Sequence, residues 1–226
     1  MISETHFCDC MEFMKGKPDK FWELAIVDPP YGLGKRLIEG GKKGGMSSLR
    51  KLADSKVEGW DKIPSEQYFT ELKRISKNQI IWGGNYFLDY LSSNDGLIIW
   101  DKMNGTNALA DAEIAWKSLS GTTRIFRKHH FSTGYEDKIH PTQKPIALYK
   151  WLLKNYAKPG DKILDTHLGS GSSRIACWDM EFDFWGCEID KDYFDAQEFR
   201  FQKHIKQPKG FFKEKDINEL KNKILF

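Results

Sequence analysis

The chain has 226 residues, of which 40% are hydrophobic and 30% charged, and its formal net charge is +3. These values fit one folded domain with a sizeable core and argue against a disordered or fibrous chain. No apolar run approaches the roughly 20 residues of a membrane span. The first ten residues lack the pattern of a signal peptide, so we expect a cytoplasmic protein.

Short apolar runs alternate with helix-like stretches along the chain, which predicts an α/β sheet covered by helices on both faces. The run Trp22–Val27 predicts a buried strand that ends at Asp28. Residues 32–62 are rich in Gly, Lys and Ser, and a segment of this length with so few apolar residues indicates a functional or mobile loop. A helix is predicted from Pro64 to about Ile75, because proline is tolerated in the first turn.

Later apolar runs predict strands in the middle of the chain at Gln79–Trp82, Gly96–Trp100, Glu113–Lys117 and Thr123–Phe126. Residues 127–141 are expected to form a loop. An amphipathic helix is predicted over Pro145–Ala157, and the stop signal Lys158-Pro159-Gly160 ends it.

The clearest unit lies towards the C-terminus. It consists of a strand at Lys162–Asp165, a glycine turn, a helix from about Ser173 to Met180, a strand at Phe182–Cys187 that ends at Glu188, and a helix at Asp192–Ile205. This order of strand, glycine turn, helix, strand and acid is typical of a nucleotide-binding half-sheet. No separate domain is predicted for the C-terminal tail, so we expect residues 1–226 to form a single domain.

The glycine turn suggests what kind of nucleotide would bind. Gly169 and Gly171 allow a tight turn at the head of a helix and a close approach of the backbone to a ligand. A dinucleotide fingerprint has a third glycine where this chain has Arg174, which weakens the prediction of a pyrophosphate site. Glu188 can accept hydrogen bonds from two ribose hydroxyls. The pattern fits a nucleoside with a small polar tail, such as S-adenosylmethionine, although a turn that uses glycine only for its geometry is the alternative.

The tetrapeptide Asp28-Pro29-Pro30-Tyr31 follows the first predicted buried strand. Two prolines fix the backbone and remove two donors but keep their carbonyl acceptors. Together with the Asp28 carboxylate, these acceptors suit a neutral –NH2 group whose lone pair is directed at an electrophile. Tyr31 offers an aromatic face on which a base can stack. The alternative is a turn after a strand with an incidental acid.

Basic residues cluster in two stretches. From Lys35 to Lys51 there are six Lys or Arg and one acid, and from Lys203 to the C-terminus there are seven Lys and three acids. Such clusters are compatible with phosphate contacts and also with ordinary solvated surfaces.

The chain has four cysteines, namely Cys8, Cys10, Cys177 and Cys187. They form no C-x-x-C pair and no second cluster that would complete a zinc site. We therefore expect free thiols and no bound metal. His129 and His130 are adjacent, and neighbouring side chains of a strand face opposite ways, so an exposed basic pair is expected there rather than a metal site.

Four motifs together resemble the β class of amino-group DNA methyltransferases, in which the catalytic motif precedes the cofactor motif. They are Asp28-Pro-Pro-Tyr31, His140-Pro-Thr-Gln-Lys-Pro145, Asp165-Thr-His-Leu-Gly-Ser-Gly171 and Gly186-Cys-Glu-Ile-Asp190. The segment Met11–Asp28 also resembles the family. The resemblance spans nearly the whole chain and implies a circularly permuted, Rossmann-like fold. That fold would be a single doubly wound α/β domain with a mostly parallel, seven-stranded sheet.

The resemblance also implies roles for individual residues. The catalytic group would be Asp28, Pro29, Pro30 and Tyr31. The cofactor, S-adenosylmethionine, would contact Asp9 and Cys10 at its adenine, Glu188 at its ribose, Asp165, Gly169, Ser170 and Gly171 at its methionine end, and Thr142 and Lys144 at its carboxylate. His167 stands where the family usually has Phe, beside the cofactor. We expect its ring to stack there and to make cofactor binding depend on pH between about 5.5 and 8.

The substrate implied by the resemblance is DNA with its target base flipped out, and members of the family often form homodimers. The stretch that commonly carries target recognition, about residues 118–139 here, is short, which predicts a short target or help from the loop at 32–62. The predicted contacts to DNA phosphates are Lys35, Arg36, Lys42, Lys43, Arg50, Lys51, Arg124, Arg127 and Lys128.

The type of base is predicted from Asp28. Cytosine-N4 relatives usually carry Ser at that position, so the carboxylate favours N6 of adenine. An N4-cytosine methyltransferase, an RNA or free-nucleotide methyltransferase, and a non-catalytic binding module that kept the fold are the alternatives. The intact Asp-Pro-Pro-Tyr and Gly-x-Gly sequences argue against the last of these.

Overall fold

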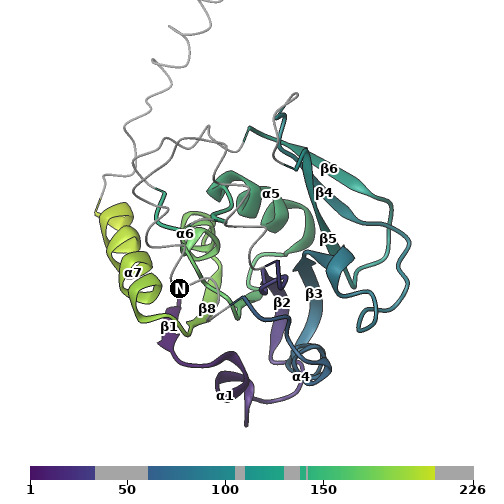
Figure 1. Cartoon of the computed structure of the whole chain (residues 1–226). Helices are drawn as coiled ribbons and strands as arrows, with labels where there is room; N and C mark the ends of the chain where they lie inside the picture. The colour runs from purple at the N-terminus through teal and green to yellow at the C-terminus, as the bar shows by residue number, and fades with distance from the viewer. Residues whose placement is uncertain (34–60, 105–109, 130–137, 141, 207–226) are drawn as a thin grey trace, which may run out of the picture.

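The computed structural model describes residues 1–33, 61–104, 110–129, 138–140 and 142–206. In this part of the chain, one sheet of eight strands has helices packed on both faces (Figure 1). Across the sheet, the strands are β1 (Ser3–Phe7), β8 (Asp183–Glu188), β7 (Lys162–Asp165), β2 (Trp22–Val27), β3 (Ser76–Trp82), β5 (Ala112–Lys117), β4 (Ile98–Asp101) and β6 (Arg124–Arg127). Every neighbouring pair is parallel except the two that β5 forms.

The sheet separates the hydrophobic core into two layers, which the helices cover. The helices are α1 (Cys10–Met14), α4 (Glu66–Ile75), α5 (Ile146–Tyr156), α6 (Ser172–Asp179) and α7 (Lys191–Ile205), with a 3-10 turn η1 at Gly84–Tyr86. Leu24 and Ile26 of β2 pack with α5 and α6 on one face, and Ala25 and Val27 pack with α1 and α4 on the other. Because successive residues of a strand face opposite ways, a strand covered on both faces is apolar throughout, as Leu24–Val27 is.

The sheet has one strand more than the seven expected. The sequence SETHF contains no apolar run, so pattern reasoning assigned no strand to Ser3–Phe7. In the structure β1 pairs in parallel with β8, from Ser3 opposite Phe184 to Phe7 opposite Glu188. It lies at the edge of the sheet with one neighbour, where a partly exposed strand does not need a continuous apolar sequence. The doubly wound, mostly parallel arrangement is confirmed.

The topology places the two principal motifs side by side. Strands β2 and β7 are neighbours, and the chain runs from β2 outwards to β3 on one side and from β7 outwards to β8 on the other. This reversal of direction is the switch point at which open α/β sheets bind ligands, outside the carboxyl ends of the strands. Asp28 directly follows β2, and the glycine turn directly follows β7. The predicted adjacency of these two motifs is therefore confirmed.

Two predicted segments lie partly outside the described residues. In the loop predicted at 32–62, this applies to residues 34–60. In the predicted recognition element at 118–139, residues 118–129 are described and include β6, whereas 130–137 are not. Within the described ranges, no helix is long and apolar enough to cross a membrane.

Candidate active site

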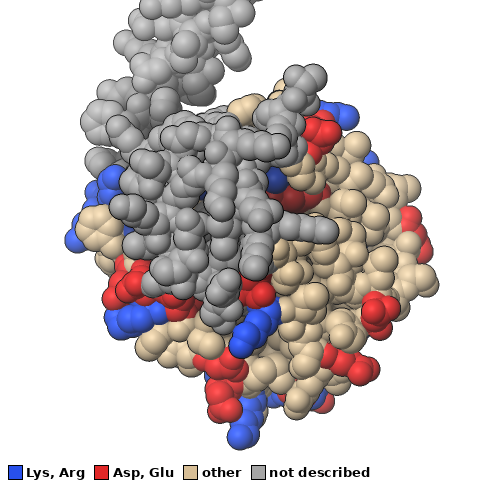
Figure 2. Space-filling model, in the orientation of Figure 1, with Lys and Arg blue, Asp and Glu red and all other residues tan. Residues whose placement is uncertain are grey.

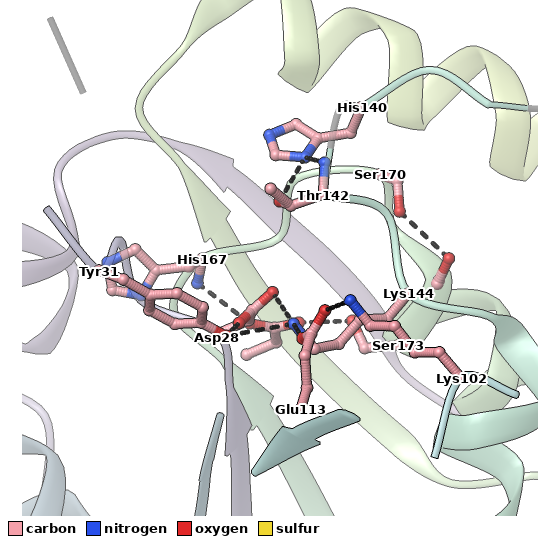
Figure 3. A network of polar contacts seen from close by, with 12 residues as sticks. Asp28, Tyr31, Lys102, Glu113, His140, Thr142, Lys144, His167, Ser170 and Ser173 are labelled. Atoms are coloured by element: carbon pink, nitrogen blue, oxygen red, sulfur yellow. Dashed lines mark hydrogen bonds and ion pairs between the residues drawn. The ribbon is translucent and has the colours of Figure 1, made fainter. Parts of the chain in front are cut away.

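The Asp28 carboxylate lies at the centre of a network of charged side chains (Figure 3). Its Oδ1 accepts a hydrogen bond of 2.5 Å from the Tyr31 hydroxyl, and its Oδ2 lies 2.5 Å from Nζ of Lys144. Burial raises the pKa of Asp28, and the nearby positive charge of Lys144 opposes this rise. The side chain is 17% exposed, so a ligand can reach it from the open edge of the sheet.

The Tyr31 ring contacts Tyr86 and Gly83. It is stacked on Tyr86, with ring centroids 4.9 Å apart and planes inclined by 17°. Gly83 has a φ of +70°, which is unfavourable for any residue with a Cβ. A Cβ on Gly83 would lie only 2.2 Å from Cε1 of Tyr31. Burial raises the pKa of Tyr31 well above its usual value, so the phenol keeps its proton and acts as a donor.

Lys144 is held between two carboxylates of the protein. Its side chain is 1% exposed, and its Nζ lies 2.5 Å from Asp28 and 2.9 Å from Oε2 of Glu113. Contact of this ammonium with the cofactor carboxylate stays a prediction. Glu113 in turn forms an ion pair of 2.6 Å with Lys102. Sequence reasoning missed Glu113 and Lys102, because neither residue belongs to a motif and both strand regions also contain another charged residue.

Asp165, at the end of β7, supports the glycine turn from within. It is 1% exposed, its Oδ1 accepts a hydrogen bond of 3.0 Å from the His167 backbone N–H, and its Oδ2 accepts one of 2.6 Å from Ser173. Burial raises the pKa of Asp165 to about 7. Both carboxylate oxygens thus hold the turn onto the first residues of α6.

The glycine turn and Glu188 form one unit. Gly169 and Gly171 have φ values of +48° and +69°, which favour glycine at both positions. The backbone N–H of Gly169 donates to Oε2 of Glu188 at 2.8 Å, while Oε1 accepts from the N–H groups of Ile189 and Asp190. Oε1 thus uses both of its lone pairs, whereas Oε2 keeps one with which to accept a ligand hydroxyl. Ser170 lies in the same turn, with its hydroxyl 3.1 Å from that of Ser172.

Asp9 and Cys10 lie next to this unit. Strand β1 runs alongside β8, and the backbone N–H of Cys8 donates to the carbonyl of Glu188 at 3.0 Å. Oδ1 of Asp9 caps helix α1 by accepting from the N–H groups of Met11 and Glu12. Burial raises the pKa of Cys10 to about 12, so this cysteine remains a neutral thiol.

The segment around His140 crosses the glycine turn. A Cβ on Gly169 would lie 3.7 Å from the His140 ring, and that ring packs against Tyr193 with centroids 4.3 Å apart. Nδ1 of His140 lies 3.1 Å from the Thr142 hydroxyl. Burial, together with the positive charges of nearby lysines, lowers the pKa of His140 to about 3, so the ring is neutral. Thr142 is thereby held close to the turn, and its contact with the cofactor carboxylate stays a prediction.

His167 does not titrate in the range expected from its sequence position. Burial lowers its pKa to about 4, so the ring is neutral between pH 5.5 and 8. Its Nδ1 lies 3.0 Å from the Thr166 hydroxyl and 3.5 Å from that of Tyr68, a fully buried residue of α4. With a pKa this low, the imidazole would not supply the pH dependence of cofactor binding expected at this position, and that dependence stays a prediction.

Comparison with known proteins identifies the family. A model of the N6/N4 DNA methylase family matches residues 80–199. The chain belongs to this family of DNA methylases. It is 20% identical to the type II methyltransferase M1.MboII of Moraxella bovis, over 88% of this chain and 96% of that one. It is 26% identical to M.HinfI of Haemophilus influenzae, over 86% of this chain and 67% of that one.

Solved structures share the fold of this DNA methylase. The M1.HpyAVI–SAM complex matches with a TM-score of 0.58 and 18% identity, over 88% of this chain and all of that one. The cytosine-N4-specific PvuII DNA methyltransferase matches with a TM-score of 0.60 and 14% identity, over 97% of this chain and 91% of that one. A putative DNA modification methylase from Thermus thermophilus matches with a TM-score of 0.59 and 19% identity, over 91% and 97% of the two chains.

The predicted DNA contacts of the methylase fall into three groups. Lys35, Arg36, Lys42, Lys43, Arg50 and Lys51 lie outside the described residues. Arg127 and Lys128 lie at the carboxyl end of β6, the edge of the sheet that carries Asp28, and the Arg127 guanidinium pairs with Asp101 at 3.3 Å.

Arg124 does not belong with this group, because it lies at the opposite end of β6. In the sheet, Arg124 lies opposite Ile98, at the start of β4. Together with Lys117 it lines a hollow at the edge of the sheet away from Asp28. On the face shown in Figure 2, the visible Lys and Arg side chains are scattered among Asp and Glu and form no single basic patch. The described residues therefore support phosphate contacts by Arg127 and Lys128 better than by Arg124.

Proposed function

We propose that this DNA methylase transfers a methyl group from S-adenosylmethionine to the exocyclic N6 amino group of adenine in DNA. The observation that carries the proposal is the Asp28 carboxylate, which ends β2 beside the glycine turn of β7 and has an aromatic ring, Tyr31, fixed next to it. An acceptor, an aromatic surface and a nucleotide-binding turn at one switch point are the parts that methylation of an amino group requires.

The residues present fit S-adenosylmethionine. Asp28, Asp165 and Glu188 end the three neighbouring strands β2, β7 and β8 at one edge of the sheet. Burial raises the pKa of Asp165 to about 7, and the charges of Asp28 and Glu188 contribute to this rise, so burial and repulsion destabilise its ionised form. A ligand that brings a positive sulfonium would relieve this repulsion. Gly169 and Gly171 adopt the positive φ values that this tight turn requires.

The residues proposed to contact the cofactor are chosen by where they lie around the glycine turn. Glu188 would hold the ribose, Asp9 and Cys10 would contact the adenine, and Ser170 and Thr142 would contact the methionine end. When bound, the cofactor supplies a methyl group on a positively charged sulfur, which needs no further activation by the protein. Lys144, which is predicted to contact the cofactor carboxylate, is paired with Asp28 and Glu113.

The protein's part in the transfer is to hold the amino group. The flipped adenine stacks on Tyr31, and its amino group donates one N–H to Asp28 and the other to a proline carbonyl of Pro29 or Pro30. Both N–H bonds are then fixed and the nitrogen lone pair is directed at the methyl group. The nitrogen–carbon bond forms as the sulfur–carbon bond breaks, and the nitrogen loses a proton to Asp28 or to water. Extrusion of the base follows because a carboxylate only 17% exposed cannot reach a stacked base.

Adenine is favoured over cytosine by the carboxylate of Asp28, since cytosine-N4 relatives usually carry Ser there. N4 methylation of cytosine is the second candidate, because a cytosine-N4-specific enzyme shares this fold. A site built around a specific polar partner discriminates strongly against a group that cannot pair with it, whereas a difference in shape alone discriminates weakly. The basic residues of the 32–62 loop, with Arg127 and Lys128, are proposed to contact DNA phosphates around the flipped base.

Nucleoside analysis tests the proposal. Duplex DNA would be incubated with the protein and methyl-labelled S-adenosylmethionine, digested, and separated into nucleosides. N6-methyladenine is expected with the wild type and with Asp19→Asn, which removes an exposed acid paired with Arg74. It is not expected with Asp28→Ala. N4-methylcytosine as the sole product would contradict the assignment of adenine.

A further inference from the structure

Four side chains of alternating charge form a continuous chain that ends at Asp28 (Figure 3). Lys102, which follows β4, lies 2.6 Å from Oε1 of Glu113 in β5. Oε2 of Glu113 lies 2.9 Å from Nζ of Lys144, and this Nζ lies 2.5 Å from Asp28. The two lysines and two carboxylates balance in charge, and they come from four separate segments of the chain.

This arrangement leaves Lys144 with two possible carboxylate partners. Its side chain is 1% exposed, so its ammonium cannot be stabilised by water and needs a protein carboxylate at all times. If Asp28 were the only partner, the ammonium would hold Oδ2 of Asp28 tightly and weaken it as an acceptor for the amino group of a base. Glu113 provides the second carboxylate. Burial would raise the pKa of Glu113, but Lys144 and Lys102 lower it to about 2, so it stays ionised.

We propose that Glu113 is a positioning residue for methyl transfer, which shares Lys144 with Asp28 and so leaves the Asp28 carboxylate able to accept the amino group of the target base. The proposal rests on the function proposed above. As the amino group approaches Asp28, the Lys144 ammonium shifts towards Glu113 without losing a carboxylate partner. Lys102 holds Glu113 in place from the other side.

The charges around Asp28 give this role a measurable signature. The groups that face or influence Asp28 come from several elements: Lys144, Glu113, Tyr31, Asp165 and Tyr149. Lys144 lowers the pKa of Asp28, whereas the negative charge of Glu113 raises it. Removing the charge of Glu113 therefore lowers the pKa of Asp28. A merely structural loss at Glu113 would slow the reaction without moving this pKa in a defined direction.

The test compares pH profiles of methyl transfer to duplex DNA for the full-length wild type and Glu113→Gln. We expect kcat to fall about 10- to 100-fold, as is typical when a charged partner that orients a reactive group is lost. Cofactor affinity should be unchanged, and the acid limb of the profile should move to lower pH. Glu71→Gln is the matched control, because it removes a carboxylate from an ion pair with Arg74 on α4 and should keep the wild-type rate.

A second variant keeps the test decisive if Glu113→Gln does not fold. Glu113→Asp retains the charge on a shorter side chain, so its acid limb should lie where the wild type has it and its kcat should be reduced. A Glu113→Gln enzyme with wild-type kcat would overturn the proposal, and so would a slowed one with an unmoved acid limb. Wild-type kcat in Glu113→Asp would also overturn it. A wild type that transfers no methyl group would overturn the proposed function itself, and this inference with it.

Discussion

Replacing Gly83 with alanine should separate the placement of the Tyr31 ring from the stability of the fold. At Gly83 the φ of +70° costs an alanine about 1–2 kcal/mol. In addition, the new Cβ would lie 2.2 Å, 2.6 Å and 2.7 Å from three atoms of the Tyr31 ring. Tyr31 must therefore move, and its hydrogen bond to Asp28 is lost. The displaced ring would also disturb its stacking on Tyr86.

The size of the effect follows from that hydrogen bond. A hydrogen bond to a charged group contributes about 1.5–3 kcal/mol. Its loss, together with a displaced stacking surface for the base, should lower kcat/KM for DNA about 10- to 100-fold, since each 1.4 kcal/mol corresponds to about a factor of ten. The assay is labelled methyl transfer at low DNA concentration, with thermal unfolding measured in parallel.

The chain offers a matched control at Gly16. Its φ is +71°, almost equal to that of Gly83, but a Cβ there would meet no atom within 4 Å. Gly16→Ala should therefore lose a similar amount of stability from backbone strain and keep wild-type methyl transfer. Equal activity in the two alanine variants would refute the reasoning that Gly83 is required for the position of the Tyr31 ring.

Three further predictions concern pH and DNA. Cofactor affinity should rise as pH increases through about 7, because burial raises the pKa of Asp165 to about 7 and a bound sulfonium favours the ionised carboxylate. Titration calorimetry on Asp165→Asn should show a flatter dependence of cofactor affinity on pH. His167→Phe should leave the shape of that profile between pH 5.5 and 8 unchanged, since the pKa of His167 is lowered to about 4, and a flattened profile would show that the imidazole titrates there. Reversing the charges of Arg127 and Lys128 should weaken DNA binding and flatten its salt dependence, whereas Arg124→Glu, at the far edge of the sheet, should not; equal effects would contradict this placement.

The sequence predicted the elements that carry the two main motifs. The strand before Asp28 and the strand before the glycine turn are apolar and covered on both faces, so their patterns were unambiguous. Strand β1 was missed because an edge strand can be short and partly polar. The adjacency of β2 and β7 was also predicted, since the order of the motifs resembled a known permuted fold.

The electrostatics of the site were not predictable in the same way. Lys144 occurs in a motif, but which carboxylates it meets depends on how β5 and the segment before α5 pack against β2. Glu113 and Lys102 lie more than 70 residues from Asp28 in the sequence and carry no motif. The neutral state of His167 depends on burial, which is a property of the folded chain. Sequence patterns predicted the reacting group, whereas the side chains that influence its charge became evident only in three dimensions.

The central claim is that Asp28 holds an amino group of adenine for methylation. The most direct measurement is the amount of N6-methyladenine formed in duplex DNA by the wild type and by Asp28→Asn at saturating S-adenosylmethionine. Asparagine keeps the size of the side chain but removes the charge that balances Lys144 and one of the acceptor oxygens. We predict that the wild type forms N6-methyladenine and that the variant binds the cofactor but forms almost none. Undiminished methylation by Asp28→Asn, or a wild type that methylates only cytosine, would contradict the account.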